Sequence, residues 1–237
     1  MGDNKKIALI TGATSGIGES TAYELANKYS LILCGRNKEK LDELKDNLSS
    51  TTKVITLEFD VRNHQEVSKK ISSLDSSWNK IELLINNAGN AHGLDFIYEG
   101  DIEDWDMMID TNVKGLLYVT KYVLDSMIKN NSGHIINISS TSSYWGDGYS
   151  PKNYVENKTL LDGRSKRLAK NVCWGDSKIR ISNIAFGQLN SQSQKNKDDT
   201  RHKISLLEAG KYVKWVIDSP RDINLHYIAL DPIQTGE

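Results

Sequence analysis

The chain has 237 residues and a formal net charge of −1, with 38% hydrophobic and 26% charged residues. This composition suits the core and the solvated surface of one large α/β unit, and the balanced charge argues against a nucleic-acid partner. No run of about 18 apolar residues predicts a membrane span, and residues 1–6 do not resemble a secretory leader. The distant Cys34 and Cys173 and the scattered histidines indicate neither a disulfide framework nor a metal site, so we expect a cytoplasmic protein.

Short apolar runs alternate with amphipathic stretches along the whole chain. The runs predicted as strands are residues 7–10, 31–34, 54–59, 83–85, 135–138, 179–184 and 225–230. Because these runs are continuously apolar, they favour burial on both faces of a parallel sheet. The alternation predicts an α/β fold, a single doubly wound Rossmann-type domain over residues 1–237 whose seven-stranded parallel sheet is flanked by helices on both faces.

Helical periodicity fills the intervals between the predicted strands. It predicts a helix that opens at Glu19, further helices after Arg36 and Asp60, and two helices between residues 101 and 128 that Ser132-Gly133 brings to an end. One composition break interrupts this pattern, a polar stretch at about residues 188–205. It is either an ordinary surface loop or a flap over the site where substrate binds.

A glycine-rich turn joins the first predicted strand to the first predicted helix, and its sequence is Thr11-Gly12-Ala13-Thr14-Ser15-Gly16-Ile17-Gly18. Gly12 permits a tight turn, while Gly16 and Gly18 leave room for a diphosphate and for helix packing. The following helix N-terminus directs amide donors at phosphates. The turn therefore predicts a dinucleotide site, with an ordinary glycine turn as the alternative. The candidate cofactor contacts in it are Gly12, Thr14, Ser15, Gly16, Ile17 and Gly18.

Two more motifs accompany this turn, Asn86-Asn87-Ala88-Gly89 and Tyr154-x-x-x-Lys158. Together with the G-x-x-x-G-x-G spacing, they make the chain resemble the short-chain dehydrogenases/reductases from Lys6 to about Ile233. Within that family it is similar to the NADP-dependent 3-hydroxy-acid (serine 3-) dehydrogenases, above all from Asp104 to Ser140. The resemblance implies an oxidoreductase that moves hydride between a nicotinamide cofactor and a CH–OH carbon.

The end of the second predicted strand bears on the choice of cofactor. An acidic residue there would bind a ribose 2′-hydroxyl and repel a 2′-phosphate, but this chain has Gly35-Arg36-Asn37. The Arg36 guanidinium suits a phosphate, and Ser15 could add a hydroxyl to the same group. We therefore expect NADP(H) rather than NAD, unless Arg36 only faces solvent.

The resemblance also assigns cofactor contacts at the ends of the third and fourth strands. It implies that Asp60, with Val61, accepts a hydrogen bond from the adenine amino group, although Asp60 could instead be a helix N-cap. It implies that Asn87 lies near the nicotinamide ribose, and that the small Ala88 and Gly89 let the backbone pass close to the cofactor.

The chemistry is expected from Tyr154 and Lys158. Carbonyl reduction needs a proton donor, and an ammonium close to a phenol lowers the phenol pKa from its ordinary value of about 10. Positions i and i+4 share one face of a helix, although such a pair can also be a mere surface contact. Ser140 would position the substrate oxygen, with Ser139 as the alternative and Ser142 and Ser143 as nearby competitors.

Two further roles in the catalytic set come from the resemblance. Lys158 would also hold the nicotinamide ribose hydroxyls. Asn112 matches the family asparagine that holds a water beside the lysine in a proton relay. Asparagine is a poor residue for a helix interior, so a local kink or a functional reason is plausible. The alternative for Asn112 is a buried asparagine whose hydrogen bonds are only structural.

The chain departs from the family pattern around the sixth strand. Gly187 is kept, but Phe186 stands where the family has proline, so the support behind the nicotinamide is expected to differ. Ser191 stands for a threonine and retains a hydroxyl that could bond the nicotinamide carboxamide. Glu156, between Tyr154 and Lys158, faces solvent or a partner subunit, or else opposes formation of the phenolate.

The substrate pocket has weaker signals. The polar stretch is shorter than in the acid-oxidising subgroup, so its substrate cannot simply be transferred. Cations that could meet a substrate carboxylate are Arg201, His202 and Lys203. Aromatic side chains that could line an apolar wall, or pack beneath a loop, are Tyr144, Trp145 and Tyr149.

Three functions are therefore considered. The first is an NADP(H)-dependent dehydrogenase of a small 3-hydroxy acid such as serine or 3-hydroxypropionate. The second is a general NADPH-dependent ketone or aldehyde reductase, and the third is a dinucleotide-binding regulatory protein without turnover. Family members form tetramers or dimers, so the resemblance also implies a homo-oligomer.

Overall fold

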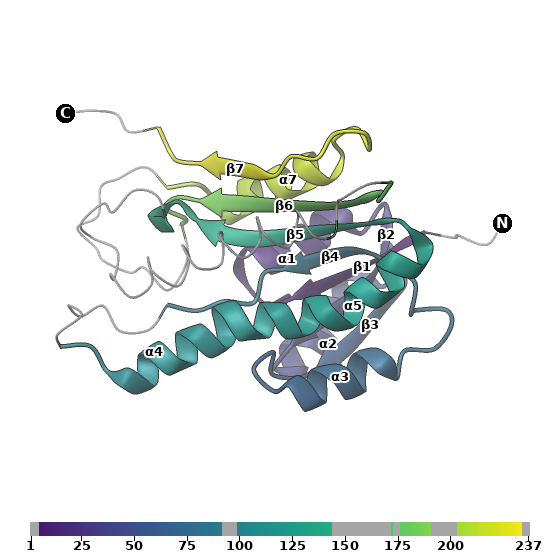
Figure 1. Ribbon diagram of the computed structural model, residues 1–237, viewed down its shortest axis with the longest axis horizontal. Helices are drawn as coiled ribbons and strands as arrows, with labels where there is room; N and C mark the ends of the chain where they lie inside the picture. The colour runs from purple at the N-terminus through teal and green to yellow at the C-terminus, as the bar shows by residue number, and fades with distance from the viewer. Residues whose placement is uncertain (1–4, 92–98, 144–171, 173–175, 191–202, 234–237) are drawn as a thin grey trace.

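The computed structural model describes residues 5–91, 99–143, 172, 176–190 and 203–233. Seven parallel strands form one sheet in the order β3-β2-β1-β4-β5-β6-β7 (Figure 1). They are β1 Lys6–Thr11, β2 Tyr29–Gly35, β3 Val54–Glu58, β4 Ile81–Asn86, β5 Gly133–Ser140, β6 Ile179–Phe186 and β7 Tyr227–Leu230. The predicted doubly wound parallel sheet is confirmed. Strand order reverses between β1 and β4, and a crevice for ligands forms beyond the carboxyl ends of the strands at such a point.

Helices cover both faces of the sheet because each carries one apolar stripe. The helices α1 (Gly16–Leu25), α2 (Lys38–Leu48) and α7 (Leu206–Ile217) contribute to one core, and α3 (His64–Ser72) and α5 (Leu116–Asn130) to the other. In α2, for example, Leu41, Leu44 and Leu48 are buried on one side. Strand residues alternate between the two cores, as Ala8 and Leu9 do in β1.

The long helix beside the sheet differs from the prediction of two separate helices. Helix α4 (Ile102–Ile109) continues through a π-helical segment, Asp110–Gly115, directly into α5. The residues at both junctions have right-handed helical angles, φ −62° and ψ −40° at Asp110 and φ −57° and ψ −46° at Leu116. The result is the single long helix that crosses the front of Figure 1. Wide turns of this kind occur mostly at functional sites.

Element boundaries also differ from the sequence expectation at glycine and asparagine positions. Helix α1 begins at Gly16 rather than at Glu19, because Gly16 adopts φ +63° as the chain enters the helix. Helix α5 ends at Asn131, whose φ of 44° is left-handed, and Gly133 is the first residue of β5 instead of a helix stop. At these positions the local backbone conformation, rather than the spacing of apolar residues, determines where a helix begins or ends.

Three buried asparagines form a row across the middle of the sheet. Asn86, Asn137 and Asn183 are partners in register on β4, β5 and β6. The Asn86 Nδ2 donates to Asn137 Oδ1 at 3.0 Å, and the Asn137 Nδ2 donates to Asn183 Oδ1 at 3.0 Å. Asn86 Nδ2 also donates to Thr120 Oγ1 on α5 at 2.9 Å. Buried amides are costly unless paired, so this row fixes the register of the three strands.

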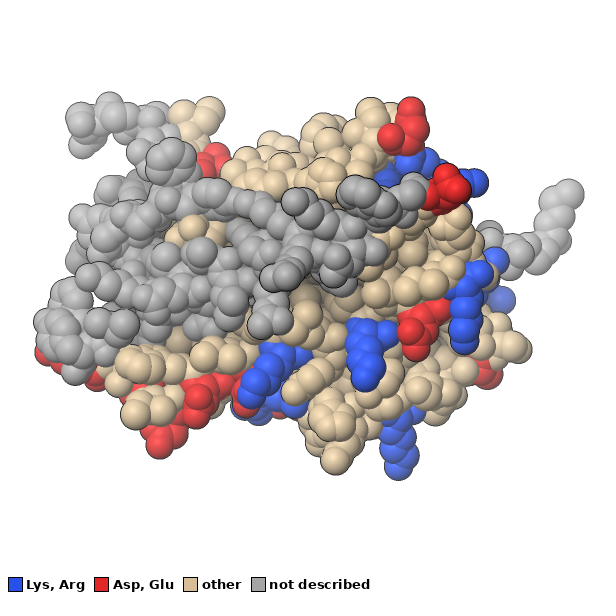
Figure 2. All heavy atoms as spheres, in the orientation of Figure 1, with Lys and Arg blue, Asp and Glu red and all other residues tan. Residues whose placement is uncertain are grey.

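On the face shown in Figure 2, Lys and Arg side chains stand among Asp and Glu side chains along the long helix and α3. Within the described part of the chain, no helix is both long and apolar enough to cross a membrane.

Candidate active site

The predicted site residues of the described chain gather at one edge of the sheet, where the strands end. The glycine turn follows β1, Arg36 follows β2, Asp60 follows β3 and Asn87 follows β4. In Figure 1 this is the edge toward which the strand arrows point. The structure therefore brings together residues that are far apart in the sequence.

The glycine turn is held by a side chain from the neighbouring strand end. Gly12 and Gly16 have φ values of 62° and 63°, and Asn87 Nδ2 donates to the carbonyl oxygens of Thr11 and Gly12, both at 3.0 Å. A Cβ on Gly18 would overlap the Gly12 carbonyl oxygen and Asn87 Nδ2. The turn thus requires glycine at position 18 for its own packing. The Nδ2 of Asn87 is committed to the turn, and its predicted place near the nicotinamide ribose stays a prediction.

Thr11 was not among the predicted site residues, yet it joins the turn to the segment after β4. Its Oγ1 accepts from the amides of Asn87 at 3.1 Å and Ala88 at 3.0 Å, and donates to the Ile85 carbonyl oxygen at 3.3 Å. The only sequence signal is a hydroxyl residue at the last position of a strand, which is too common to single it out.

The N-terminus of α1 is open to a ligand. Ser15 is exposed, it is the N-cap, and its side chain makes no capping hydrogen bond. A Cβ on Gly16 would meet no atom within 4 Å, so free space lies beside the first amides of the helix. By contrast, Ile17 is only 8% exposed and packs in the core, which leaves its backbone as the part available to a cofactor. Thr14 packs against Gly35, where an added Cβ would lie 3.2 Å from its Cγ2.

A cluster of charges stands at the ends of β2 and β3. Arg36 is 69% exposed, and its Nη1 lies 3.9 Å from Asp60 Oδ2. Arg62 was missed by the sequence analysis, although it binds Asp60 with Nε at 3.1 Å from Oδ1 and Nη2 at 2.6 Å from Oδ2. Burial would raise the pKa of Asp60, but hydrogen bonds from Arg62 and the charges of both arginines outweigh it and lower the pKa. Asp60 therefore carries its charge and fixes Arg62 beside Arg36.

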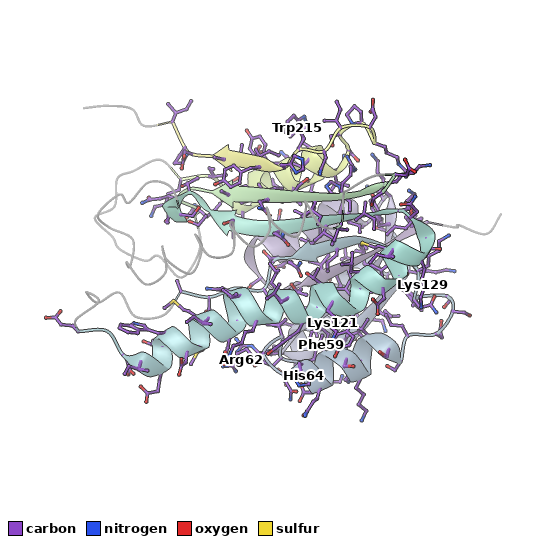
Figure 3. The ribbon with its side chains drawn as sticks, viewed as in Figure 1. Phe59, Arg62, His64, Lys121, Lys129 and Trp215 are labelled. Atoms are coloured by element: carbon purple, nitrogen blue, oxygen red, sulfur yellow. The ribbon has the colours of Figure 1, made fainter. Side chains whose placement is uncertain are left out.

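The N-cap alternative for Asp60 was wrong, because α3 begins after a different residue. Asn63 Oδ1 accepts from the amides of Gln65 and Glu66 and is the cap of that helix. Asp60 Oδ1 accepts instead from the amide of Arg62 at 3.0 Å. Figure 3 labels Arg62 near the start of α3. The adenine contact that the resemblance implies for Asp60 and Val61 stays a prediction.

Asn112 lies inside the π-helical segment and is 2% exposed. Its Oδ1 accepts from the backbone amide of Asn90, and its Nδ2 donates to the backbone carbonyl of Asn90, each at 2.9 Å. These two hydrogen bonds connect the long helix to the segment after β4, which includes the exposed Gly89. The side-chain amide is thereby satisfied within the chain, as in the structural alternative, and the water relay that the resemblance implies for Asn112 stays a prediction.

Ser140 is the last residue of β5, and a 3₁₀ turn, Thr141–Ser143, follows it. Its Oγ accepts from the Ser142 amide at 3.2 Å, and its carbonyl oxygen accepts from Ser143 Oγ at 2.9 Å. The neighbouring Ser139 Oγ is buried and makes no hydrogen bond within the described structure. Adjacent strand residues face opposite sides, so the choice between Ser139 and Ser140 as the substrate-positioning hydroxyl remains one for mutagenesis.

The end of β6 differs from the family pattern in a way that the structure explains. Phe186, in place of proline, is 2% exposed and fills the core on the side of α1 and α7. Gly187 donates its amide to the Leu230 carbonyl oxygen at 2.8 Å, and a Cβ on it would overlap Asp231 Oδ1. Asp231 Oδ1 accepts from Thr141 Oγ1 at 2.7 Å. Sequence analysis missed Asp231, because nothing local marks a residue just beyond a short strand.

Several predicted residues lie outside the described part of the chain, so their roles remain predictions. They are Tyr144, Trp145, Tyr149, Tyr154, Glu156, Lys158, Ser191, Arg201 and His202.

A cavity of about 1240 Å³ lies at the opposite, amino edge of the sheet. Its charges largely pair among themselves: Lys6 Nζ is 2.9 Å from Glu82 Oε2, and Lys28 Nζ is 2.8 Å from Asp218 Oδ1. Arg180 donates to several carbonyl oxygens at and beyond the end of α7, including that of Ile217 at 3.3 Å. Because ligands of open parallel sheets bind at the carboxyl ends of strands, this cavity is not the candidate active site.

His134 lines the same cavity and is 5% exposed. Its Nε2 lies 2.9 Å from Ser182 Oγ. Burial, and secondly the charge of Arg180, lowers the pKa of His134 to about 3, so the folded protein holds this imidazole neutral at physiological pH.

Comparison with known proteins identifies the family and the fold. A model of the family described as short chain dehydrogenase matches residues 6–202. The chain belongs to this family. It is 34% identical to the NADP-dependent 3-hydroxy acid dehydrogenase YdfG of Salmonella typhi, over 96% of this chain and 95% of that one. The resemblance inferred from the motifs is thereby confirmed.

Two solved structures are similar to this short-chain dehydrogenase. A crystal structure of serine dehydrogenase from Escherichia coli matches with a TM-score of 0.82 and 33% identity, over 94% of this chain and 96% of that one. The closed form of serine dehydrogenase complexed with NADP+ matches with a TM-score of 0.85 and 32% identity, over 94% of each chain. This chain is therefore an oxidoreductase that acts on CH–OH groups.

Proposed function

We propose that this short-chain dehydrogenase transfers hydride between NADP(H) and a small 3-hydroxy acid or its 3-oxo counterpart, with serine and 3-hydroxypropionate as first candidates. The proposal rests on one observation above all. An open helix N-terminus lies beside an exposed Arg36 at the edge where the strands end. The relatives named above are NADP-dependent or bound to NADP+ and act on 3-hydroxy acids or serine by their names.

The relatives confirm the expectation that the cofactor is NADP rather than NAD. The residues present fit this dinucleotide. A Cβ on Gly16 would enter free space beside the α1 amides, and the position after β2 holds Arg36 rather than an acidic residue. Arg36 and Arg62 would hold the 2′-phosphate, with Asp60 orienting Arg62. When bound, the nicotinamide supplies or accepts the hydride.

The protein's own contribution is to position the substrate and move a proton. Tyr154 would donate the proton to the substrate oxygen, and the Lys158 ammonium would keep the phenol pKa low enough for exchange near neutrality. Ser140, whose position at the end of β5 is fixed by the following turn, would hold the substrate oxygen. The site needs no metal in this scheme.

The test is a titration followed by a substrate screen. Quenching of protein fluorescence should show tighter binding of NADPH than of NADH, and a panel of 3-hydroxy acids with NADP+ should produce NADPH absorbance. Tyr154→Phe should bind NADPH like the native protein but lose turnover by about 10²-fold or more. A native protein that binds NADPH yet turns over no alcohol or carbonyl would refute the proposal.

A second candidate is a reductase of neutral ketones or aldehydes. The observation that favours it is the carboxylate of Asp231 at the reaction edge, where a 3-hydroxy acid would call for a cation. Of the predicted cations, only Lys203 is described, and it is half-buried. Neutral carbonyls turned over far faster than acids in the same screen would support this candidate.

We also propose that residues 1–237 form one domain that assembles as a homo-tetramer or homo-dimer in the cytoplasm. Exposed apolar side chains on α7 support the assembly: Trp215 is 61% exposed and Leu207 58%, and Trp215 is labelled in Figure 3. Large exposed apolar side chains of this kind favour protein contacts. Analytical ultracentrifugation that shows a monomer would refute the assembly.

A further inference from the structure

We infer that Asp231 determines substrate specificity, and this inference rests on the proposed function. Its carboxylate favours substrates that carry an ammonium, or no charge, near the reacting carbon over substrates whose only charge is a carboxylate. Among small hydroxy compounds, amino alcohols and 2-amino-3-hydroxy acids would then be preferred to simple 3-hydroxy acids.

The first support is the strand register at the reaction edge. Ser140 on β5 pairs with Phe186 on β6, and Phe186 pairs with Leu230 on β7. The next residue on each strand is therefore in one row, and these residues are Thr141, Gly187 and Asp231. This row lies one residue beyond the proposed substrate-positioning hydroxyl of Ser140.

The second support is the path of the Asp231 side chain along that row. Its Oδ1 lies 2.7 Å from Thr141 Oγ1, which donates to it, so the carboxylate reaches from the end of β7 to the end of β5. It passes over Gly187, where even a methyl group would overlap Oδ1. The carboxylate is thus held in one place by a hydrogen bond and by a glycine that leaves room for it.

The third support is that no described residue neutralises the charge of Asp231. Thr141 offers a neutral hydroxyl, and Asp231 forms no ion pair with any described residue. The residue is exposed, so a substrate can approach it. A negative charge at such an edge attracts a cationic substrate and repels an anionic one.

The expected size follows from Coulomb's law. For charges about 8 Å apart at an effective dielectric constant of about 30, the interaction corresponds to about a tenfold change in kcat/KM. Attraction of an ammonium and repulsion of a carboxylate would therefore separate the two kinds of substrate by about 100-fold, with an uncharged substrate between them.

The experiment compares three alcohols of matched chain length with NADP+: 3-amino-1-propanol, 3-hydroxypropionamide and 3-hydroxypropionate. The native protein should show kcat/KM falling in that order. Asp231→Asn keeps an acceptor for Thr141 and should bring the three values within a few-fold of one another. The matched control Asp222→Asn removes a carboxylate at the opposite edge, beside the amino-edge cavity, and should keep the native order.

A second measurement needs no variant. Raising the ionic strength from about 0.05 to 0.5 M shortens the screening length and should shrink the native ratio between the cationic and anionic alcohols. The inference is overturned if the native protein does not show this order of kcat/KM, or if the order persists unchanged in Asp231→Asn or at high salt. In either case, turnover of the alcohols would still support the proposed function. NADPH binding without turnover of any of the three or of the wider screen refutes the proposed function, and the inference with it.

Discussion

Replacing Gly18 by alanine has two opposite effects on the free energy of unfolding: a gain in helix propensity and a loss of packing in the cofactor turn. Gly18 is the third residue of α1, where alanine is favoured over glycine by about 1 kcal/mol. Against this, the added Cβ would overlap the Gly12 carbonyl oxygen and Asn87 Nδ2. Gly16→Ala is the matched comparison, because a Cβ there meets no atom within 4 Å but the backbone has φ +63°.

The structure decides which effect is larger. Overpacking of this kind costs about 1–3 kcal/mol, and displacing Asn87 weakens its two hydrogen bonds to the turn, each worth about 1 kcal/mol. The net loss for Gly18→Ala is about 2–4 kcal/mol, a fall in Tm of about 4–16 °C for a chain of this size. For Gly16→Ala only the left-handed strain of about 1–2 kcal/mol applies.

Thermal melts with and without NADPH, together with fluorescence titration of NADPH, separate the two variants. Gly18→Ala should melt lower than Gly16→Ala and bind NADPH at least tenfold more weakly, because the turn itself has moved. Gly16→Ala should lose NADPH affinity with a smaller loss of stability than Gly18→Ala, since its methyl group enters the space left for phosphate. A Gly18→Ala protein as stable as the native chain, with native NADPH affinity, would refute this reasoning.

Three further predictions concern other parts of the molecule. Arg36→Ala should weaken NADPH binding about 10- to 100-fold and leave NADH binding unchanged in titrations, because only the 2′-phosphate uses the charge-assisted bonds. Burial lowers the pKa of His134 from 6.5 to about 3; the unfolded chain binds more protons in that window, so urea stability should fall as pH drops from 6.5 toward 3, with His134 contributing up to about 1.4 kcal/mol per pH unit, and His134→Gln should remove this contribution and make the slope shallower. Asn137→Ala should lower the free energy of unfolding by about 2–5 kcal/mol in urea melts, because Asn86 and Asn183 each lose a buried partner.

Each of these three has a control at an exposed position: a second cationic residue for Arg36, a second histidine for His134 and a second asparagine for Asn137. Lys40→Ala, on the first turn of α2, should leave the NADPH to NADH ratio unchanged. His226→Gln should keep the acid dependence, and Asn130→Ala should keep native stability. Equal losses of NADPH and NADH affinity in Arg36→Ala, an unaltered slope in His134→Gln, or a native melt for Asn137→Ala would contradict the corresponding prediction.

Much of the fold could be predicted because the strands are apolar on both faces. Ile135 and Ile136 contribute one side chain to each core, so the apolar run in the sequence is enough to predict β5. The continuity of the long helix could not be predicted in the same way. The segment Asp110–Gly115 carries no signal in apolar periodicity, since a π turn depends on contacts such as that between Asn112 and Asn90.

The site divides along similar lines. The glycine turn and Arg36 are visible because local sequence requires them. Asp231 escapes notice because its importance arises from a partner across the sheet, Thr141, and strand register is not written in any local motif. Arg62 lies only two residues after its partner Asp60, but no motif marks this pair. Tyr154 and Lys158 remain predictions of the motif.

The π-helical segment also limits how the length of the chain can change. Compared with an α-helix, the wider turn accommodates additional chain, and each α-helical residue rotates the helix by about 100°. Deleting a single residue between 110 and 115 would favour an ordinary α-helix, turn α4 about its axis relative to α5, and swing Asn112 away from Asn90. Evolution can therefore exchange side chains here far more readily than it can shorten the segment. A relative with an alignment gap inside this segment would have to fix the loop after β4 without the bond between Asn112 and Asn90.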